Sequence, residues 1–484
     1  MGKVTGFIEW VRQDMGERPV HARLKDWADF KEPLKKQEVK QQAGRCMDCG
    51  IPFCQQGCPL GNLIPDWNDA IYHEDWKRAF LALQATNPLP EFTGRLCPAP
   101  CEGACVLGIN DDPVSIEQLE LTTSEYAFEA GWVEPRLPLK ESGNTVAIIG
   151  SGPAGLAAAT ILRESGHSVT VFERDAQLGG LLRYGIPDFK LEKWIIDRRV
   201  EILQKSGIQF QTNVEVGSDA LTWSQLMQNY DAVVLCTGAP VARDINIPGR
   251  DLDGIHYAME YLTAQNRVNS KEAILPTHLS AEGKRVIVIG GGDTGSDCLG
   301  TALRQGAREV IQLELMPPPP KTRADDNPWP NWPKVYRISS SHAEGGERRF
   351  SFSTQKFEGE SGQLTALVGK ILDPSGDEGQ NSSVGQEHVI QCDMVLLAMG
   401  FTGPDFTLLH QELQIPLDEK GHLIVDQNGR CPSAPIYVAG DAKRGASLIV
   451  WALSDGVEIA RAVDQDLRGR SSILSRGSDA PFNK

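Results

Sequence analysis

The sequence predicts an α/β protein with a small α-helical domain at the N-terminus and two larger α/β domains, one inserted in the other. Three observations lead to this prediction. Seven of the eleven cysteines lie between residues 46 and 105, where β-branched runs are few. Two glycine-rich turns follow, and each lies between a strand pattern and a helix pattern.

Changes in composition set the predicted domain boundaries along the 484 residues. Residues 1–140 form the helical domain, and residues 135–144, with two prolines, a glycine and mixed charges, are typical of a linker. Residues 145–255 and 390–484 form one α/β domain. Residues 256–389 form the domain inserted in it.

Two β-α-β units indicate duplicated Rossmann-like nucleotide-binding domains. The first has TVAII at 145–149, a helix from about Pro153 and SVTVF at 168–172. The second has RVIVI at 285–289, a helix from about Thr294 and a strand at 309–315. Other predicted elements are helices over 65–83, 113–130 and from about Ser447, and strands at 231–237, 394–398 and 436–439.

Two segments are predicted to lack regular structure. Residues 317–334 (PPPPKTRADDNPWPNWPK) contain too many prolines for a helix or strand, which predicts an ordered surface loop or lid. Residues 373–388 are polar and rich in Gly and Ser, which predicts a hairpin tip or a flexible insertion.

Composition excludes several functional classes. A net charge of −16 argues against a general nucleic-acid or anionic-membrane binder. No 18-residue apolar run is present, and the first residues lack the apolar core of a signal peptide or a transit peptide. We therefore expect a soluble cytoplasmic protein, or a stromal one if the source has plastids. In such a reducing compartment, closely spaced cysteines bind metal or carry redox chemistry more often than they form disulfides.

The cysteine spacing is typical of iron–sulfur ligands. The pattern is Cys46-x2-Cys49-x4-Cys54-x3-Cys58-Pro59 followed by Cys97-x3-Cys101-x3-Cys105. In bacterial two-cluster patterns the cysteine before proline binds the other cluster. By that logic the first three cysteines bind one [4Fe-4S] cluster, and Cys58 joins the last three on a second. Zinc is the competing interpretation, but triplets of cysteines favour iron–sulfur over paired CxxC ribbons.

Two such clusters need eight ligands, and the block supplies seven. The other four cysteines lie in the nucleotide-binding half. The predicted helix at 113–130 carries Glu117, Gln118 and Glu120, so the eighth ligand is expected from this helix, although any single Glu there could equally face solvent.

The first glycine fingerprint is Gly150-Ser-Gly152-Pro-Ala-Gly155, with Glu173 at the end of the next strand. In such a unit the first glycine makes the turn and the second admits a pyrophosphate. The third allows close packing, and the acid binds a ribose hydroxyl.

A Gly-Asp pair late in the chain decides which dinucleotide binds the first fingerprint. Gly440 and Asp441 follow a buried strand, as in flavoproteins whose terminal Asp lies near the ribityl–phosphate part of FAD. Together with the first fingerprint, this pair predicts FAD.

The second fingerprint is Gly290-Gly-Gly292-Asp-Thr-Gly295, which predicts the nicotinamide dinucleotide site. Glu314 ends the following strand, where an acid accepts the 2′-OH of NADH and repels a 2′-phosphate. The sequence therefore favours NADH. NADPH stays open, because Arg323 could reach a 2′-phosphate from the proline-rich loop.

Substrate chemistry of its own is not evident in the chain. We find no convincing Ser-His-Asp set, HExxH motif or P-loop, and no CxxC in the nucleotide-binding half. Hydride transfer from nicotinamide to flavin is cofactor chemistry. The final substrate is therefore expected to be reduced on another polypeptide.

Over essentially its full length the chain resembles the small (β) subunit of glutamate synthase. The resemblance extends to residues 93–105 (TGRLCPAPCEGAC), 179–190 (GGLLRYGIPDFK) and 327–333 (NPWPNWP). The same module resembles the N-terminal half of dihydropyrimidine dehydrogenase and the large subunit of NADH-dependent ferredoxin:NADP oxidoreductase. The resemblance implies that the chain oxidises NAD(P)H at FAD. Electrons would then pass through two [4Fe-4S] clusters to the FMN of a large (alpha) subunit with a glutaminase domain, which makes glutamate from glutamine and 2-oxoglutarate.

The resemblance also implies particular site residues. In the relatives that the chain resembles, the first cluster takes three cysteines and a non-cysteine ligand from a following helix. The residue at that position in this sequence is Glu120. The arginine that reads a 2′-phosphate in some relatives falls at Leu315, next to Glu314. Residues implied at the FAD site are Leu181, Lys190 and Val214, and those implied near the nicotinamide cofactor are Asp293, Thr294 and Gly400.

Two other functions remain open at this point. One is the diaphorase module of a pyrimidine-reducing or transhydrogenase-type complex, which would share all the cofactor motifs. The other is a non-enzymatic iron–sulfur scaffold or redox-sensing protein. The NPWPNWP segment favours glutamate synthase.

Overall fold

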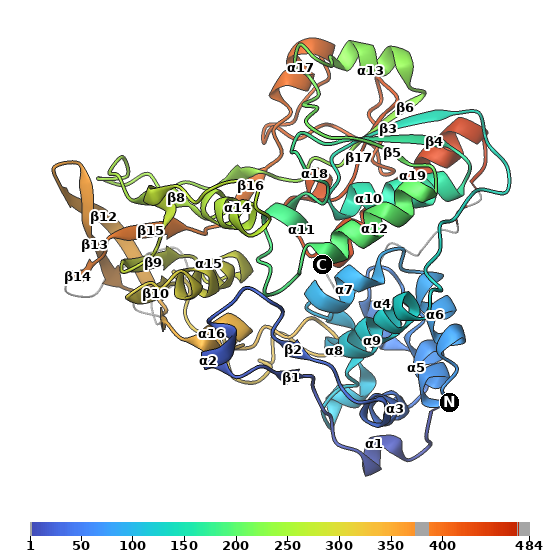
Figure 1. Ribbon diagram of the computed structural model, residues 1–484, viewed down its shortest axis with the longest axis horizontal. Coiled ribbons are helices and arrows are strands. Elements are labelled where there is room, and N and C mark those ends of the chain that lie inside the picture. The colour runs from blue at the N-terminus through green and yellow to red at the C-terminus, as the bar shows by residue number, and fades with distance from the viewer. Residues whose placement is uncertain (1, 373–386, 472, 474–484) are drawn as a thin grey trace.

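The computed structural model describes residues 2–372, 387–471 and 473. Figure 1 shows three lobes: a helical lobe from the N-terminal part of the chain and two α/β lobes. Among the described residues, no helix has the length and apolar character required to cross a bilayer.

The helical lobe contains short helices joined by turns. Its helices are α1 (Gly6–Glu9), α3 (Lys36–Gly44), α4 (Phe53–Gly57), α5 (Ile64–Tyr72), α6 (Trp76–Gln84), α7 (Pro90–Leu96), α8 (Pro100–Gly103), η1 (Val106–Ile109) and α9 (Ile116–Glu129). Helix α2 (Val20–Arg23) belongs to the same part of the chain but lies beside the second α/β lobe (Figure 1). Strands β1 (Gly16–Glu17) and β2 (Lys31–Glu32) form a small ribbon. The helix predicted over 65–83 is divided, because Glu74 has a left-handed φ of +62° and Asp75 caps α6 by accepting from the Arg78 N–H.

The first α/β lobe contains a five-stranded parallel sheet in the order β17-β6-β3-β4-β5. Its strands are β3 (Thr145–Ile149), β4 (Ser168–Phe172), β5 (Gln209–Gln211), β6 (Ala232–Leu235) and β17 (Ile436–Val438). Its helices are α10 (Pro153–Glu164), α11 (Leu181–Tyr184), α12 (Trp194–Lys205), α13 (Trp223–Asn229), α17 (Thr407–Leu413), α18 (Asp441–Arg444) and α19 (Ile449–Arg468). Helices α10 and α19 pack closely, because a Cβ on Gly456 would lie 2.4 Å from the Ala154 carbonyl.

The second α/β lobe contains a sheet in the order β11-β10-β9-β15-β8. Its strands are β8 (Ile255–Tyr257), β9 (Arg285–Ile289), β10 (Glu309–Leu313), β11 (Glu347–Arg349) and β15 (Met394–Leu397). Beside it lies an antiparallel sheet of β12 (Phe352–Glu360), β13 (Gln363–Ile371) and β14 (His388–Gln391). The lobe also contains α14 (Ala258–Asn269), η2 (Thr277–Leu279), α15 (Asp293–Arg304) and α16 (Ser340–Glu344).

Sheet membership differs from the division predicted at residue 390. Strand β15 pairs with β9 and β8 of the second sheet, not with the first. The chain returns to the first lobe after β16 (Phe401–Gly403), which pairs with β7 (Val241–Ala242). Both β15 and β17 are short, buried and apolar, so their sequences do not distinguish the two sheets.

The two segments expected to be irregular differ in what the structure describes. Residues 317–334 contain no helix or strand, in agreement with the prediction. The predicted hairpin tip falls mainly on residues 373–386, which lie outside the described residues; β13 and β14 on either side of it pair in antiparallel fashion.

Buried ion pairs join the lobes. Arg23, on the N-terminal helix α2 that lies beside α16 (Figure 1), is 2.8 Å from Glu344 of the second α/β lobe, and Arg304 pairs with the same carboxylate. Arg199 on α12 pairs at 2.5 Å with Glu91 on α7 of the helical lobe. All five side chains are at most 5% exposed. Because an unpaired buried charge is costly, these pairs couple the lobes.

Candidate cluster and dinucleotide sites

The fold gathers four cysteines, the first cysteine set, around one mostly apolar cavity. Its members are Cys46, Cys49, Cys54 and Cys105. Burial raises the pKa of Cys46 to about 11, and the nearby Cys105 thiol acts in the same direction. The Asn68 side chain lines this cavity and hydrogen-bonds to Cys46, which acts on that pKa in the opposite direction. Four thiols with an amide donor beside one of them fit a cluster whose sulfurs accept hydrogen bonds.

The remaining block residues form a second ligand set. Its members are Cys58, Cys97, Cys101 and Glu120. Burial raises the pKa of all three thiols, to about 11 for Cys58, and the carboxylate of Glu120 raises each pKa further. Buried thiols of this kind lose their protons when they bind a metal centre.

This arrangement corrects the grouping predicted from sequence. Cys105 was expected with Cys58, Cys97 and Cys101, and Glu120 with the first three cysteines. The structure exchanges the places of these two residues. Helix α8 lies between Cys97 and Cys105, and its turn directs Cys105 toward the cavity of the first set, whereas α9 brings Glu120 to the second. The spacing rule describes where sulfurs occur along the chain but not how the chain turns after Cys101.

Within the described part of the chain, no group of three or more His, Cys, Asp or Glu side chains is arranged to hold a metal ion directly. A cubane differs from a single ion because each of its four irons takes its own protein ligand. The donor types, four thiols in one set and three thiols with a carboxylate in the other, are compatible with such clusters.

Glu120 is held by three polar neighbours inside the helical lobe. It accepts hydrogen bonds from Asn62 Nδ2 at 3.3 Å, from Asn87 Nδ2 at 3.2 Å and from the Thr93 hydroxyl. Burial raises its pKa to about 8. The side chain is therefore oriented within the protein and does not lie on a solvated helix face, which was the alternative for any Glu on this helix.

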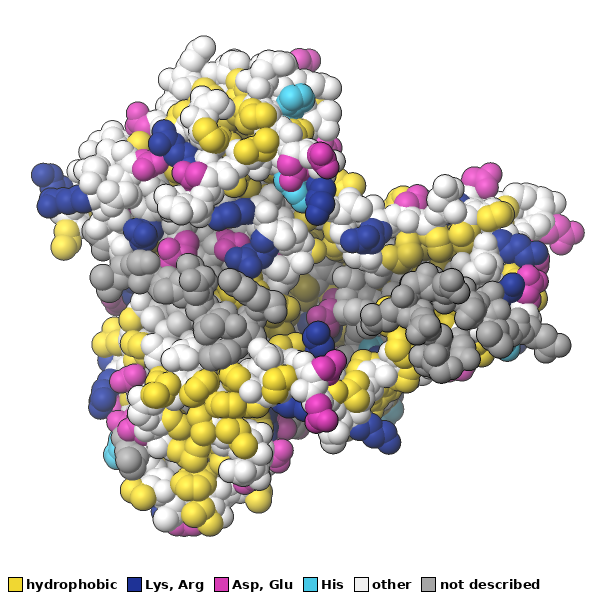
Figure 2. Space-filling model, turned by 180° about the vertical axis from the view of Figure 1, so that it is seen from behind, with side chains coloured by type: hydrophobic (Ala, Val, Ile, Leu, Met, Phe, Trp, Pro, Cys, Tyr) yellow, Lys and Arg dark blue, Asp and Glu magenta, His cyan; other side chains and the backbone are white. Residues whose placement is uncertain are grey.

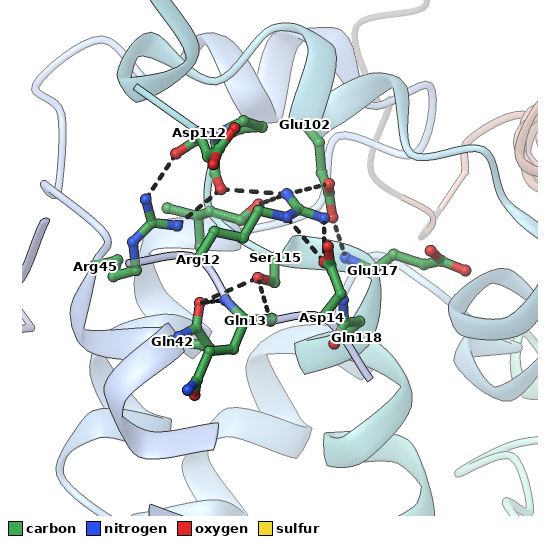
Figure 3. Close-up of polar contacts among 12 residues, drawn as sticks. Arg12, Gln13, Asp14, Gln42, Arg45, Glu102, Asp112, Ser115, Glu117 and Gln118 are labelled. Atoms are coloured by element: carbon green, nitrogen blue, oxygen red, sulfur yellow. Dashed lines mark hydrogen bonds and ion pairs between the residues drawn. The ribbon is translucent and has the colours of Figure 1, made fainter. Parts of the chain in front are cut away.

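The N-terminal segment supports the two cysteine runs through a polar network (Figure 3). Arg12 Nη1 lies 2.7 Å from Glu102, between Cys101 and Cys105, and the Glu117 N–H donates to the same carboxylate. Arg45, which precedes Cys46, donates to the carbonyls of Asp112 and Pro113. The network therefore joins the first cysteine run to the second.

Replacing Arg12 by alanine is expected to weaken cluster retention. Glu102 would stay buried without its cation, which costs about 3 kcal/mol for a buried pair. Iron release during heating should occur at a lower temperature than in the wild type. Lys3→Ala, which removes the more exposed Lys3–Glu9 pair, is the control and should have little effect. Equal release temperatures for the two variants would contradict the role of Arg12.

The first glycine loop has the geometry that a dinucleotide requires. Gly150 has φ of +101°, and a Cβ there would lie 2.5 Å from the Cys236 carbonyl. A Cβ on Gly155 would lie 2.0 Å from the Gly150 carbonyl, so the helix packs directly on the turn. Around Gly152 a Cβ would meet nothing within 4 Å. The loop is thus closed on the protein side and open where a pyrophosphate would bind.

The acids predicted at this site lie beside the loop. Glu173 is buried and accepts from the Ser151 N–H at 3.1 Å and from its hydroxyl at 2.6 Å. A Cβ on Gly440 would lie 2.7 Å from Cβ of Ala154, so Asp441 lies next to the start of α10. Burial raises the pKa of Asp441, and the Ser447 hydroxyl donates to its carboxylate.

The three residues implied by resemblance at the FAD site have different surroundings. Leu181 begins α11 and is half exposed, directly after Gly180, which touches the backbone of the first glycine loop. Val214 donates its N–H to the Glu173 carbonyl at 2.9 Å. The Lys190 ammonium pairs with Asp297 on α15 and so spans the two α/β lobes.

The second glycine loop repeats the first. Gly290 has φ of +123°, and its Cβ would lie 2.2 Å from the Ala398 carbonyl at the end of β15. A Cβ on Gly295 would lie 2.3 Å from the Gly290 carbonyl, whereas a Cβ on Gly292 would meet nothing within 4 Å. Two further predicted residues, Asp293 and Thr294, form the first turn of α15, and Gly400 follows β15 with φ of +82°.

Glu314 and Arg323 are the two charged residues that bear on the choice between NADH and NADPH. Glu314 accepts from the Gly291 N–H at 2.7 Å and from the Met316 N–H at 2.9 Å, so its carboxylate adjoins the glycine loop. Arg323 donates to the carbonyls of Asn331 and Gly103. The guanidinium considered for a 2′-phosphate is therefore engaged on the helical lobe.

Sequence reasoning missed a chain of hydrogen-bonded side chains behind the second glycine loop. Gln312 donates to the Gly290 carbonyl at 2.7 Å and contacts His342 Nε2 at 2.6 Å. The other ring nitrogen of His342 contacts the Ser339 hydroxyl at 2.9 Å, which contacts Ser296 of α15 at 2.6 Å. Burial lowers the pKa of His342 to about 4, so the ring is neutral at physiological pH. A Gln among the buried, otherwise apolar residues 310–313 of β10 was the available signal.

Comparison with known proteins gives two family matches. Residues 23–132 match the family described as dihydropyrimidine dehydrogenase domain II, 4Fe-4S cluster. Residues 144–332 and 350–456 match pyridine nucleotide-disulphide oxidoreductase.

The full-length relatives decide the family. A Mycobacterium tuberculosis protein named glutamate synthase [NADPH] small chain is 49% identical, over 98% of each chain. A Bacillus subtilis protein of the same name is 45% identical, over 98% of this chain and 100% of that one. The chain belongs to the glutamate synthase small-chain family. This small chain also matches a Schizosaccharomyces pombe protein named glutamate synthase [NADH], at 43% identity over 99% of its own length but 23% of the yeast protein.

Solved structures agree on the fold of the small chain. Mycobacterium tuberculosis FprA in complex with NADPH has a TM-score of 0.54 at 21% identity, over 67% of this chain and 85% of that one. The predicted fold class is therefore confirmed. The matches also support iron–sulfur, flavin and nicotinamide cofactors for this small chain.

Proposed function

We propose that this chain is the electron-input subunit of a two-subunit glutamate synthase. It would oxidise NAD(P)H at FAD and pass electrons through two [4Fe-4S] clusters to the FMN of a large subunit, which makes glutamate from glutamine and 2-oxoglutarate. The observation that carries the proposal is the succession of sites: two glycine loops, then the second ligand set, then the first cysteine set. When bound, the flavin supplies the change from electron pairs to single electrons.

Contacts between the lobes support this order. The Ser454 hydroxyl of α19 donates to the Pro59 carbonyl, next to Cys58, at 2.9 Å. Two residues further along α19, Gly456 packs on Ala154 beside the first glycine loop. One helix thus connects the predicted FAD loop with the second ligand set, so electrons would enter there.

The first cysteine set would then be the point of exit. The segments around it carry exposed hydrophobic side chains, and Figure 2 shows hydrophobic side chains gathered on the helical lobe. Ile8, Val11, Ile51 and Ile109 are each more than half exposed. Patches of this kind mark protein interfaces. We assign this face to the FMN-bearing large subunit, in a hetero-oligomer. In the yeast relative a chain four times longer contains the module, which fits a permanent partner.

We infer a preference for NADH over NADPH. Glu314 lies at the glycine loop, Leu315 replaces the arginine of some relatives, and Arg323 is bound to carbonyls elsewhere. The names of relatives include both coenzymes, NADPH for the bacterial proteins above and NADH for the yeast one.

The test is reconstitution with a large chain. The small chain alone should reduce ferricyanide with NAD(P)H and contain about eight irons and eight acid-labile sulfides, as two cubanes require. Together with a large chain carrying glutaminase and FMN domains, it should form glutamate from glutamine and 2-oxoglutarate. Failure to oxidise either coenzyme, or zinc in place of iron, would contradict the proposal.

A further inference from the structure

The proline-rich loop at residues 317–334 has no part in the function described so far. It leaves the second α/β lobe directly after β10 and Glu314, yet its contacts are with the helical lobe. Asn327 is buried and organises the loop internally: its Nδ2 donates to the Trp332 carbonyl, and its Oδ1 accepts from the Lys334 N–H.

Three contacts place the loop on the Cys101–Cys105 segment. Arg323 Nη2 donates to the Gly103 carbonyl at 2.9 Å. Any Cβ at Gly103 would lie 2.9 Å from Cδ of Pro333, so the loop lies directly on this glycine. Trp329 Nε1 donates to the Cys105 carbonyl at 3.3 Å.

Trp329 also contacts the first cysteine run, through Phe53. Its ring centre lies 4.7 Å from that of Phe53, which lines the same cavity as Cys49 and Cys54. One indole therefore contacts both chain segments that supply the first set.

We propose that Trp329 closes the wall of the first cluster site and thereby sets the reduction potential of the cluster held there, with Arg323 holding the loop in place. This inference rests on the proposed function, because it assumes a cluster on the first cysteine set. Solvent exposure and hydrogen bonding around the sulfurs control the potential of such clusters, and an apolar shell controls the access of water. Trp329 is a positioning residue in this scheme.

Removing the indole would admit water to the first site. Water stabilises the reduced cluster, which carries more negative charge, so its potential should rise. In Trp329→Ala, redox titration followed by EPR should show a higher midpoint for the first cluster and an unchanged midpoint for the second. An iron chelator should also remove iron from the first site faster. Trp329→Phe keeps a ring against Phe53 but loses the N–H. This variant therefore distinguishes the effect of the aromatic ring on water access from the effect of the hydrogen bond to the Cys105 carbonyl.

Two further variants keep the test decisive. Arg323→Gln removes the anchor on Gly103 without altering the indole and should shift the same midpoint in the same direction. Trp194→Ala removes a half-exposed indole from α12 and should shift neither. Unchanged midpoints in both Trp329→Ala and Arg323→Gln, or equal shifts of both clusters, would overturn the inference. A wild-type protein without two distinct cluster signals would instead contradict the proposed function.

Discussion

Glu120→Ala is expected to remove or alter one cluster signal in the EPR spectrum of the reduced protein and to leave the other unchanged. Glu120 shares its buried site with Cys58, Cys97 and Cys101, and no other member of the set is a carboxylate. Losing it leaves one iron of the second cluster without its protein ligand. Iron and sulfide analysis should show loss from one cluster at most.

Glu117→Ala is the matched control, three residues earlier on α9. Its side chain pairs with Lys31 at 3.3 Å and belongs to neither ligand set. This variant should keep both signals.

Cysteine variants test the exchange of Cys105 and Glu120 between the sites. Cys105→Ala and Cys49→Ala should remove the same signal, because both cysteines line one cavity. Cys97→Ala should alter the signal that Glu120→Ala alters. If Cys105→Ala instead matched Cys97→Ala, the grouping predicted from the Cys-Pro spacing would be right and the structural grouping wrong.

Glu314→Ala is expected to lower kcat/KM for NADH about thirtyfold, which corresponds to about 2 kcal/mol for hydrogen bonds to a charged group. The carboxylate accepts the Gly291 N–H and lies where an acid binds the ribose 2′-OH. The value for NADPH should fall less, because a repulsive charge is removed at the same time. Stopped-flow reduction of the flavin by each coenzyme would measure both.

A second variant tests the same site in the opposite direction. Glu314→Ser combined with Leu315→Arg should favour NADPH, because it supplies a cation for the 2′-phosphate. Glu309→Ala, at the opposite end of β10, is the control and should change neither value. A wild-type enzyme that strongly prefers NADPH, with a preference unaffected by Glu314→Ala, would show our inference to be wrong.

The dinucleotide loops could be predicted from sequence because their requirements are local. Gly150 and Gly290 are needed for positive φ, and Gly155 and Gly295 for close packing, so each spacing specifies its own geometry. The strand, the turn and the helix are neighbours along the chain. Such local patterns can therefore be recognised in the sequence without knowledge of the rest of the fold.

The features that sequence reasoning missed all depend on contacts between distant segments. The ligand grouping depends on how α8 turns after Cys101, which spacing does not encode. The place of β15 in the second sheet depends on pairing with β9, more than a hundred residues earlier. From the sequence, Arg323 could have reached a 2′-phosphate from the proline-rich loop, but it binds the Gly103 carbonyl, 220 positions earlier in the chain.

The ion pairs between the lobes affect the stability of any truncated form of this protein. Arg23, Glu344 and Arg304 form one buried charge group that spans the chain from its beginning to its inserted domain. A shortened flavoprotein that begins after the linker would lose Arg23, leaving Glu344 paired with Arg304 alone, and would leave Arg199 without Glu91. Removing the helical lobe is therefore expected to destabilise the two α/β lobes. A minimal diaphorase cut from this chain would need the Arg199 surface redesigned to recover that stability.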